Sequence, residues 1–125
     1  INESALIREM VCAPFYKGDI KFAISNYEKI KQENPTFVYH TLLNTIGYNL
    51  LESKRIMEAI EVFQLNVKEN PKSADYLDSL GEGYFVAGEY ELSEQYYLKA
   101  IELDSGSSNA KMMIEKIKNL HQENN

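Results

Sequence analysis

Several residue types that define common protein classes are scarce here. The 125 residues include one Cys, three Pro, six Gly and no Trp. One Cys excludes an internal disulfide framework and a thiolate-rich zinc site, and so few Pro and Gly exclude a collagen-like or low-complexity chain. Neither a secretory signal pattern nor an apolar run of the ~18 residues that span a bilayer is present. The length suits one compact domain.

Positive charge is also scarce. Asp and Glu outnumber Lys and Arg by 19 to 13, which gives a formal net charge of −6. Such a balance repels phosphate backbones and anionic lipid, so we expect neither nucleic acid nor a membrane as partner. The sequence begins with Ile, and we expect it to be a fragment of a longer chain. The compartment is left open.

Two segments repeat at a spacing of 34 residues without a gap. Each has a Leu, then a Leu or Ile followed by Gly, then a large residue, a small residue and an aromatic residue. These are Leu43, Ile46, Gly47, Leu50, Ala59 and Phe63 in the first segment, and Leu77, Leu80, Gly81, Tyr84, Ser93 and Tyr97 in the second. A partial third copy lies upstream at Ala23, Tyr27 and Pro35. Its Pro precedes the next by 36 residues, so we place the two extra residues in the connection 36–39.

Apolar residues within these units recur with helical spacing, and no β-like alternation competes. Breaks at residues 53–54, 87–89 and 105–107 separate the helices, so we expect seven. The first helix runs from Glu3 and is expected to be interrupted by Pro14, because proline removes a backbone donor. Asn34 and Asn70, each before a Pro, are expected to end helices.

The repeated residues resemble the tetratricopeptide repeat. The resemblance implies an all-α, right-handed solenoid of about three helix pairs with a C-terminal capping helix. Its units would be a degenerate repeat at 1–35, repeats at 36–71 and 72–105, and the cap at 106–122, within a single domain 1–125. Gly47 and Gly81 cost about 1 kcal/mol each inside a helix, and we expect close helix packing on small Ala59 and Ser93 to offset this.

The amino-acid sequence of the repeats is also similar to the C-terminal tail of certain bacterial serine hydrolases. In those proteins a β-lactamase-like or esterase-like domain precedes the repeats. Residues 24–31, 43–48, 59–63, 65–67 and 76–82 carry this resemblance. No catalytic machinery accompanies it: Ser108 and Lys111 form a lone Ser-x-x-Lys, better explained by a helix N-cap. His40 and Cys12 have no partners for metal binding or nucleophilic chemistry. We expect a non-catalytic chain without cofactor or metal.

By resemblance to the family, the first helices line a concave groove. The residues predicted to line it are Asn44, Tyr48, Glu52, Asp75, Asp78, Glu82, Phe85 and Met112. Three of its carboxylates share one helical face, either as a solvated surface or as an acidic groove that favours a basic peptide. Tyr48 and Phe85 are equally well explained as core.

Two functions remain open. One is a protein-interaction module with a partly acidic groove. The other is a C-terminal accessory domain of a serine hydrolase, which packs on its own catalytic domain or mediates oligomerisation. Because three units are near the minimum for a stable solenoid, apolar positions on the first unit could also drive self-association.

Overall fold

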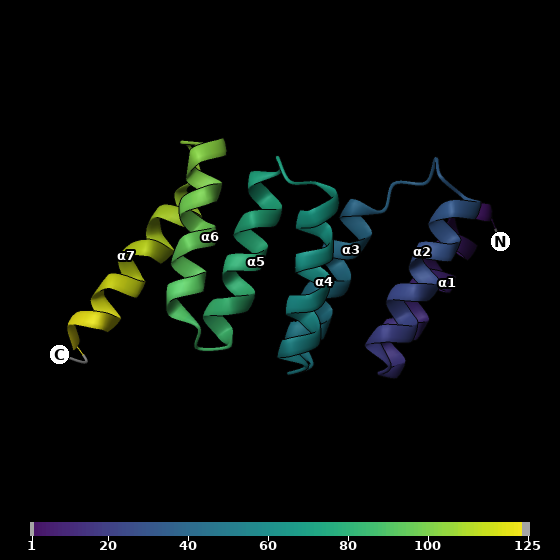
Figure 1. The fold of residues 1–125 in the computed structure, drawn as a ribbon, viewed down its shortest axis with the longest axis horizontal. Coiled ribbons are helices and arrows are strands. Elements are labelled where there is room, and N and C mark those ends of the chain that lie inside the picture. The colour runs from purple at the N-terminus through teal and green to yellow at the C-terminus, as the bar shows by residue number, and fades with distance from the viewer. Residues whose placement is uncertain (1, 124–125) are drawn as a thin grey trace.

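The computed structural model describes residues 2–123, and these form seven helices and no strand (Figure 1). The helices are α1 (Glu3–Lys17), α2 (Ile20–Glu33), α3 (His40–Glu52), α4 (Ile56–Glu69), α5 (Ala74–Val86), α6 (Tyr90–Leu103) and α7 (Ser108–Glu123). The expected all-α solenoid of three helix pairs and a final helix is confirmed.

The helix pairs stand side by side in two layers. In one layer α3 contacts both α1 and α5, and each of these three helices packs against the second helix of its own pair. α4 also packs against α5, and α6 against α7, so apolar packing continues from one unit to the next. One cluster of buried side chains runs from α1 to α5 and a smaller one from α5 to α7.

Local chemistry sets the ends of several helices. Asp19 and Ser73 cap α2 and α5 through their side-chain oxygens, which accept backbone N–H groups 3.1 and 3.2 Å away. Asn34 and Asn70 end α2 and α4, as expected. In both residues the backbone N–H and the side-chain amide donate to the same carbonyl four residues earlier.

The expectation that Pro14 interrupts the first helix is wrong, because α1 continues through it to Lys17 and ends at Gly18, whose φ is 111°. Proline removes the N–H that would bond the carbonyl of Met10. The side-chain amide of Asn26 on α2 supplies the missing donor at 3.0 Å. A side chain of α2 therefore satisfies the carbonyl in α1 that the proline leaves without a donor.

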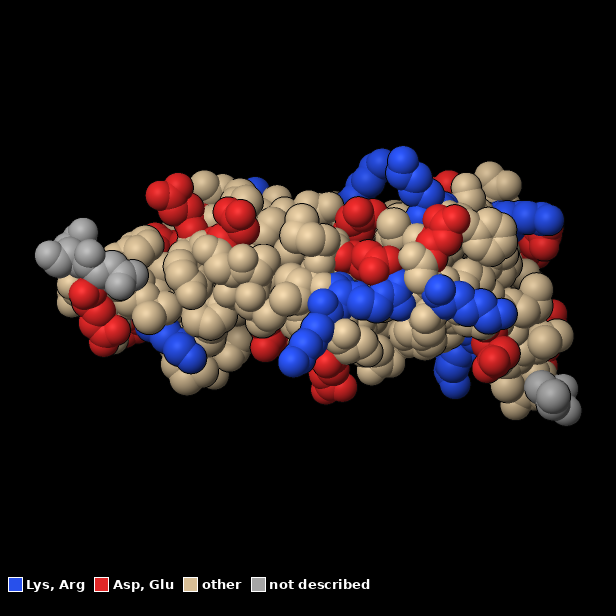
Figure 2. Space-filling view, turned by 90° about the horizontal axis from the view of Figure 1, so that it is seen from below, with Lys and Arg blue, Asp and Glu red and all other residues tan. Residues whose placement is uncertain are grey.

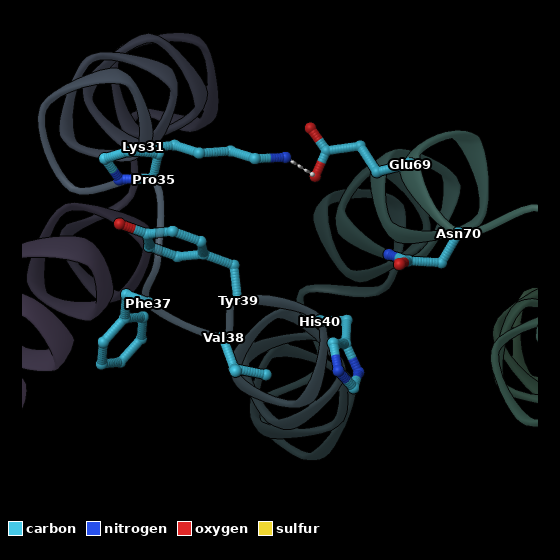
Figure 3. Close-up of a pocket in the computed structure, with 8 residues that line it drawn as sticks. All are labelled: Lys31, Pro35, Phe37, Val38, Tyr39, His40, Glu69 and Asn70. Carbon is cyan, nitrogen blue, oxygen red and sulfur yellow. Dashed lines mark ion pairs between the residues drawn. The ribbon is translucent and has the colours of Figure 1, made fainter.

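The first unit is joined to the second by the longer connection that the sequence predicts. Residues 34–39 link α2 to α3, whereas residues 70–73 link α4 to α5. A hollow of about 270 Å³ lies beside this connection (Figure 3). Glu69 of α4 bridges it, because its carboxylate pairs with Lys31 at 3.1 Å and accepts a hydrogen bond from Tyr27 at 2.5 Å.

The helix glycines allow aromatic rings to approach the backbone. A Cβ at Gly47 would lie 2.3 Å from the ring of Phe63, and one at Gly81 would lie 3.0 Å from the ring of Tyr97. Ser93 does face Gly81, since its hydroxyl donates to the Gly81 carbonyl at 2.7 Å. The atoms that would meet an added Cβ first are nevertheless those of the rings, rather than the small residues expected from the sequence.

Candidate functional site

Polar side chains from α3, α5 and α7 meet on one face of the solenoid. The hydroxyl of Tyr48 on α3 donates to Ser79 Oγ on α5 at 3.1 Å. The amide of Asn109 on α7 donates to both carboxylate oxygens of Asp78, at 3.1 and 2.9 Å. Glu82 lies one turn beyond Asp78 on the same side of α5. We call the surface formed by Tyr48, Asp78, Ser79, Glu82 and Asn109 the acidic face.

Two buried polar atoms at this face lack a partner. The hydroxyl of Tyr97, a residue with no exposed surface, has no hydrogen-bond partner among the described residues. The same holds for the side-chain oxygen of Asn44, which precedes Tyr48 by one turn of α3. Buried polar groups are normally hydrogen-bonded, so both atoms are unsatisfied within the described structure, and neither reaches its surface.

The electrostatics of the face disfavour further negative charge. Burial raises the pKa of Asp78 above its ordinary value, and the neighbouring carboxylates of Glu82 and Asp75 raise it further, while the hydrogen bond from Asn109 lowers it. Burial also raises the pKa of the Tyr97 hydroxyl, with added effects from Asp78 and Glu82. A cation placed here would relieve this repulsion.

The other residues predicted to line a groove lie around this cluster. Asp75 and Glu52 are exposed, and Met112 is 61% exposed on α7. Phe85 is partly buried in the C-terminal apolar cluster, and its ring lies 5.3 Å from the ammonium of Lys116. Phe85 and Tyr48 both pack against the core, so they combine a structural role with partial exposure.

The negative charge of the chain is unevenly distributed. Residues 72–125 contain ten acidic and five basic residues, whereas residues 1–71 contain nine and eight. Figure 2 views the molecule from below, and its Lys and Arg side chains gather mainly over the half that holds the N-terminal helices. The acidic face therefore belongs to the more negative half of the molecule.

A separate hollow of about 430 Å³ opens between α4 and α6, on the layer opposite the acidic face. Its lining includes the exposed Met57 and Leu92 and the Tyr84 side chain, whose hydroxyl accepts a hydrogen bond from Gln64 at 2.7 Å. This hollow is a second candidate surface, but its lining indicates no particular ligand chemistry.

Other candidate groups offer little chemistry. Ser108 is exposed at the first position of α7. Burial raises the pKa of the Cys12 thiol, so it is protonated at neutral pH. Within residues 2–123, no group of three or more His, Cys, Asp or Glu side chains is placed to hold a metal ion. No helix in this part of the chain is both long and apolar enough to cross a membrane.

The sequence reasoning did not foresee the contributions of Tyr97 and Asn109. A Tyr stands at position 97 where the preceding repeat has Phe63, and that difference was the available signal. No signal in the sequence pointed to Asn109, because its hydrogen bonds to Asp78 depend on how α7 is placed against α5.

Solved structures with the same fold are tetratricopeptide-repeat domains. The first such domain of Spaghetti (RPAP3), solved with HSP90 peptide SRMEEVD, superposes with a TM-score of 0.68 at 19% identity, over 96% of this chain and 94% of that one. The Sgt2 domain from Aspergillus fumigatus gives 0.67 at 22% identity, over 98% and 82%. MamA from Desulfovibrio magneticus RS-1 gives 0.54 at 20% identity, over 97% and 77%.

The chain thus has the fold of a tetratricopeptide-repeat domain. No family model and no curated protein matched the sequence in these comparisons.

Proposed function

We propose that this chain is a non-catalytic protein-interaction module whose acidic face binds a basic segment of a partner protein. The observation that carries the proposal is the group of carboxylates on α5, where the half-buried Asp78 interacts with Glu82 and the exposed Asp75. A lysine ammonium has three donors and no acceptor, so the neighbouring carboxylates of this face match its needs.

A structural neighbour offers a useful contrast. The RPAP3 domain was solved with the peptide SRMEEVD, which contains two Glu and ends in Asp. The acidic face of this chain presents Asp78 and Glu82, with Asp75 one turn before Asp78, so the same acidic peptide would meet like charges there. We therefore expect the opposite preference, for Lys or Arg over Asp or Glu.

The test is fluorescence anisotropy with two labelled peptides, one of alternating Lys and Ser and the other SRMEEVD. We expect the basic peptide to bind, and its affinity to fall as salt rises. Glu82→Gln is expected to weaken binding about three- to tenfold, and Glu102→Gln, an exposed change on α6, to leave it unaltered. Preferential binding of SRMEEVD, or equal losses in both variants, contradicts the proposal.

Tyr97→Phe separates binding from stability. Removing an unsatisfied buried hydroxyl is expected to raise the free energy of unfolding by about 1 kcal/mol, and to leave binding of the basic peptide unchanged because the hydroxyl does not reach the surface. A less stable variant would show that the hydroxyl has a partner, and weaker peptide binding would show that it contacts the ligand.

The resemblance to bacterial serine-hydrolase tails supports an alternative proposal, in which the chain is the accessory domain of such an enzyme. The sequence encoded immediately upstream decides it. A hydrolase domain with a Ser-x-x-Lys or Gly-x-Ser-x-Gly motif supports this alternative, and a complete short gene refutes it.

A further inference from the structure

The first helix carries a stripe of apolar side chains between two charged ones, and the rest of the described chain covers it only in part. Positions 3, 6, 10, 13 and 17 follow one another at alternating spacings of three and four, the spacing of a helix-pairing seam. Leu6 is 51% exposed and Met10 is 47% exposed. We call these five positions of α1 the α1 seam.

Phe22 on α2 extends this surface. Its side chain is 59% exposed, and it lies one helical turn before Asn26, whose amide donates to the Met10 carbonyl. An exposed aromatic ring of α2 therefore adds to the apolar surface of the first unit. The apolar surface is shared by both helices of the first unit.

The positions of Leu6 and Met10 are buried on α3, where a unit precedes, whereas the α3 counterpart of Ala13 is the exposed Asn49. Aligning Val11 with Gly47 and Gly81 makes Leu42 and Ile46 of α3 the counterparts of Leu6 and Met10, and these are 8% and 0% exposed. On α5, the counterpart of Met10 is the buried Leu80. The counterpart of Ala13 is Gly83, where a Cβ would lie 3.2 Å from Ile60 and Phe63 of α4. The α1 seam is thus the stacking face of the repeat without its neighbour.

The ends of the α1 seam differ from these counterparts in charge. Glu3 and Lys17 lie seven residues on either side of Met10, and both are exposed. Neither forms an ion pair within residues 2–123. Their counterparts carry no charge: Tyr39 and Ser53 on α3, and Ser73 and Ala87 on α5.

We infer that the α1 seam pairs with the α1 seam of a second copy of this chain, antiparallel about a two-fold axis at Met10. Because Glu3 and Lys17 are equidistant from Met10, this arrangement places each Glu3 against Lys17 of the other copy, with apolar residues between them. The opposite end of the solenoid is a poorer partner, since exposed positions of α7 include Lys111, Glu115 and Lys118. This contact uses another surface than the acidic face.

Sedimentation velocity of the whole chain tests the inference. A short helix pair buries less than the ~1,600 Å² of a standard interface, so we expect a weak dimer with a dissociation constant on the order of 10 to 100 µM. Met10→Glu places two like charges at the axis and is expected to weaken dimerisation at least about a hundredfold. Met57→Glu, at the 70% exposed Met57 of α4, is the matched control and should dimerise normally.

Charge reversal tests the antiparallel geometry itself. Glu3→Lys and Lys17→Glu each turn two attractive pairs into two repulsive ones, so each variant alone should dimerise about tenfold more weakly. In an equimolar mixture, the two variants form a heterodimer in which both pairs are attractive, so association should return. Circular dichroism verifies that each variant is folded.

The remaining outcomes overturn the inference. A wild-type chain that stays monomeric to about 500 µM, several times the expected dissociation constant, shows that the α1 seam does not bind a second copy. Recovery that fails in the mixture, with folded variants, refutes the antiparallel pairing. A loss of dimer with Met57→Glu equal to that with Met10→Glu places the contact elsewhere.

Discussion

The two repeat glycines are predicted to tolerate alanine differently. In Gly47→Ala, the new Cβ would lie 2.3 and 2.6 Å from two ring carbons of Phe63. Carbon atoms prefer separations of about 3.5 Å, so the ring has to move by about 1 Å. Phe63 is 1% exposed and its ring packs edge-on against Tyr48 at 5.1 Å, which leaves it little room.

The magnitudes follow from two opposing effects. Overpacking of this size costs about 3 kcal/mol, and alanine recovers about 1 kcal/mol of helix propensity. The net loss in Gly47→Ala is therefore about 2 kcal/mol. In Gly81→Ala the nearest atoms of Tyr97 lie 3.0 Å away, so a shift of a few tenths of an ångström suffices. We expect that variant to stay within about 0.5 kcal/mol of the wild type.

Urea unfolding followed by circular dichroism measures both free energies, and a double variant tests the cause. In a Phe63→Leu background the ring is gone, so Gly47→Ala is expected to cost nothing or to gain up to about 1 kcal/mol. Equal losses at the two glycines would refute the reasoning. So would a Gly47→Ala loss that persists without the ring.

Two carboxylates are predicted to affect stability in opposite directions. The Arg55 guanidinium lowers the pKa of Glu58 through hydrogen bonds of 2.8 Å. Glu58→Gln should therefore lower the free energy of unfolding by up to about 1 kcal/mol at pH 7. This difference from the wild type should disappear as the pH falls through the lowered pKa of Glu58. Burial raises the pKa of Asp78 above 3.8, so the charged carboxylate lowers the stability of the fold at pH values above the raised pKa. Asp78→Asn should therefore raise the free energy of unfolding by up to about 1 kcal/mol at pH 7. This gain should vanish below pH 3.8, where the carboxyl is protonated in the folded and the unfolded chain. Thermal melts of both variants and the wild type, from pH 7 to below pH 3.8, measure these changes in stability. A change of the same sign in both variants at pH 7 would contradict the assignment. Finally, the purified chain should hydrolyse neither p-nitrophenyl acetate nor a chromogenic β-lactam, and turnover abolished by Ser108→Ala would show that it is catalytic.

Much of the fold could be read from local chemistry. The spacing of Gly47 and Gly81, and the Asn-Pro pairs at Asn34 and Asn70, predicted the helix pairs and their ends because capping and periodicity act within a few residues. The prediction at Pro14 was wrong because the donor for the Met10 carbonyl comes from Asn26, sixteen residues after Met10. Such a contact leaves no local pattern.

The candidate site was accessible only in part. The helical spacing of Asp75, Asp78 and Glu82 puts three carboxylates on one side of α5, and this follows from the sequence alone. That they lie beside the hydroxyls of Tyr48 and Tyr97 depends on the packing of α3 and α6 against α5.

The sequence by itself therefore determined the repeat, the seven helices and the surplus of negative charge, because each depends on residue type and spacing along the chain. Tertiary structure decided which polar atoms are left without partners and which apolar face of α1 is left uncovered. Burial and hydrogen bonding are properties of neighbours in space, and those neighbours are set by the stacking of the units.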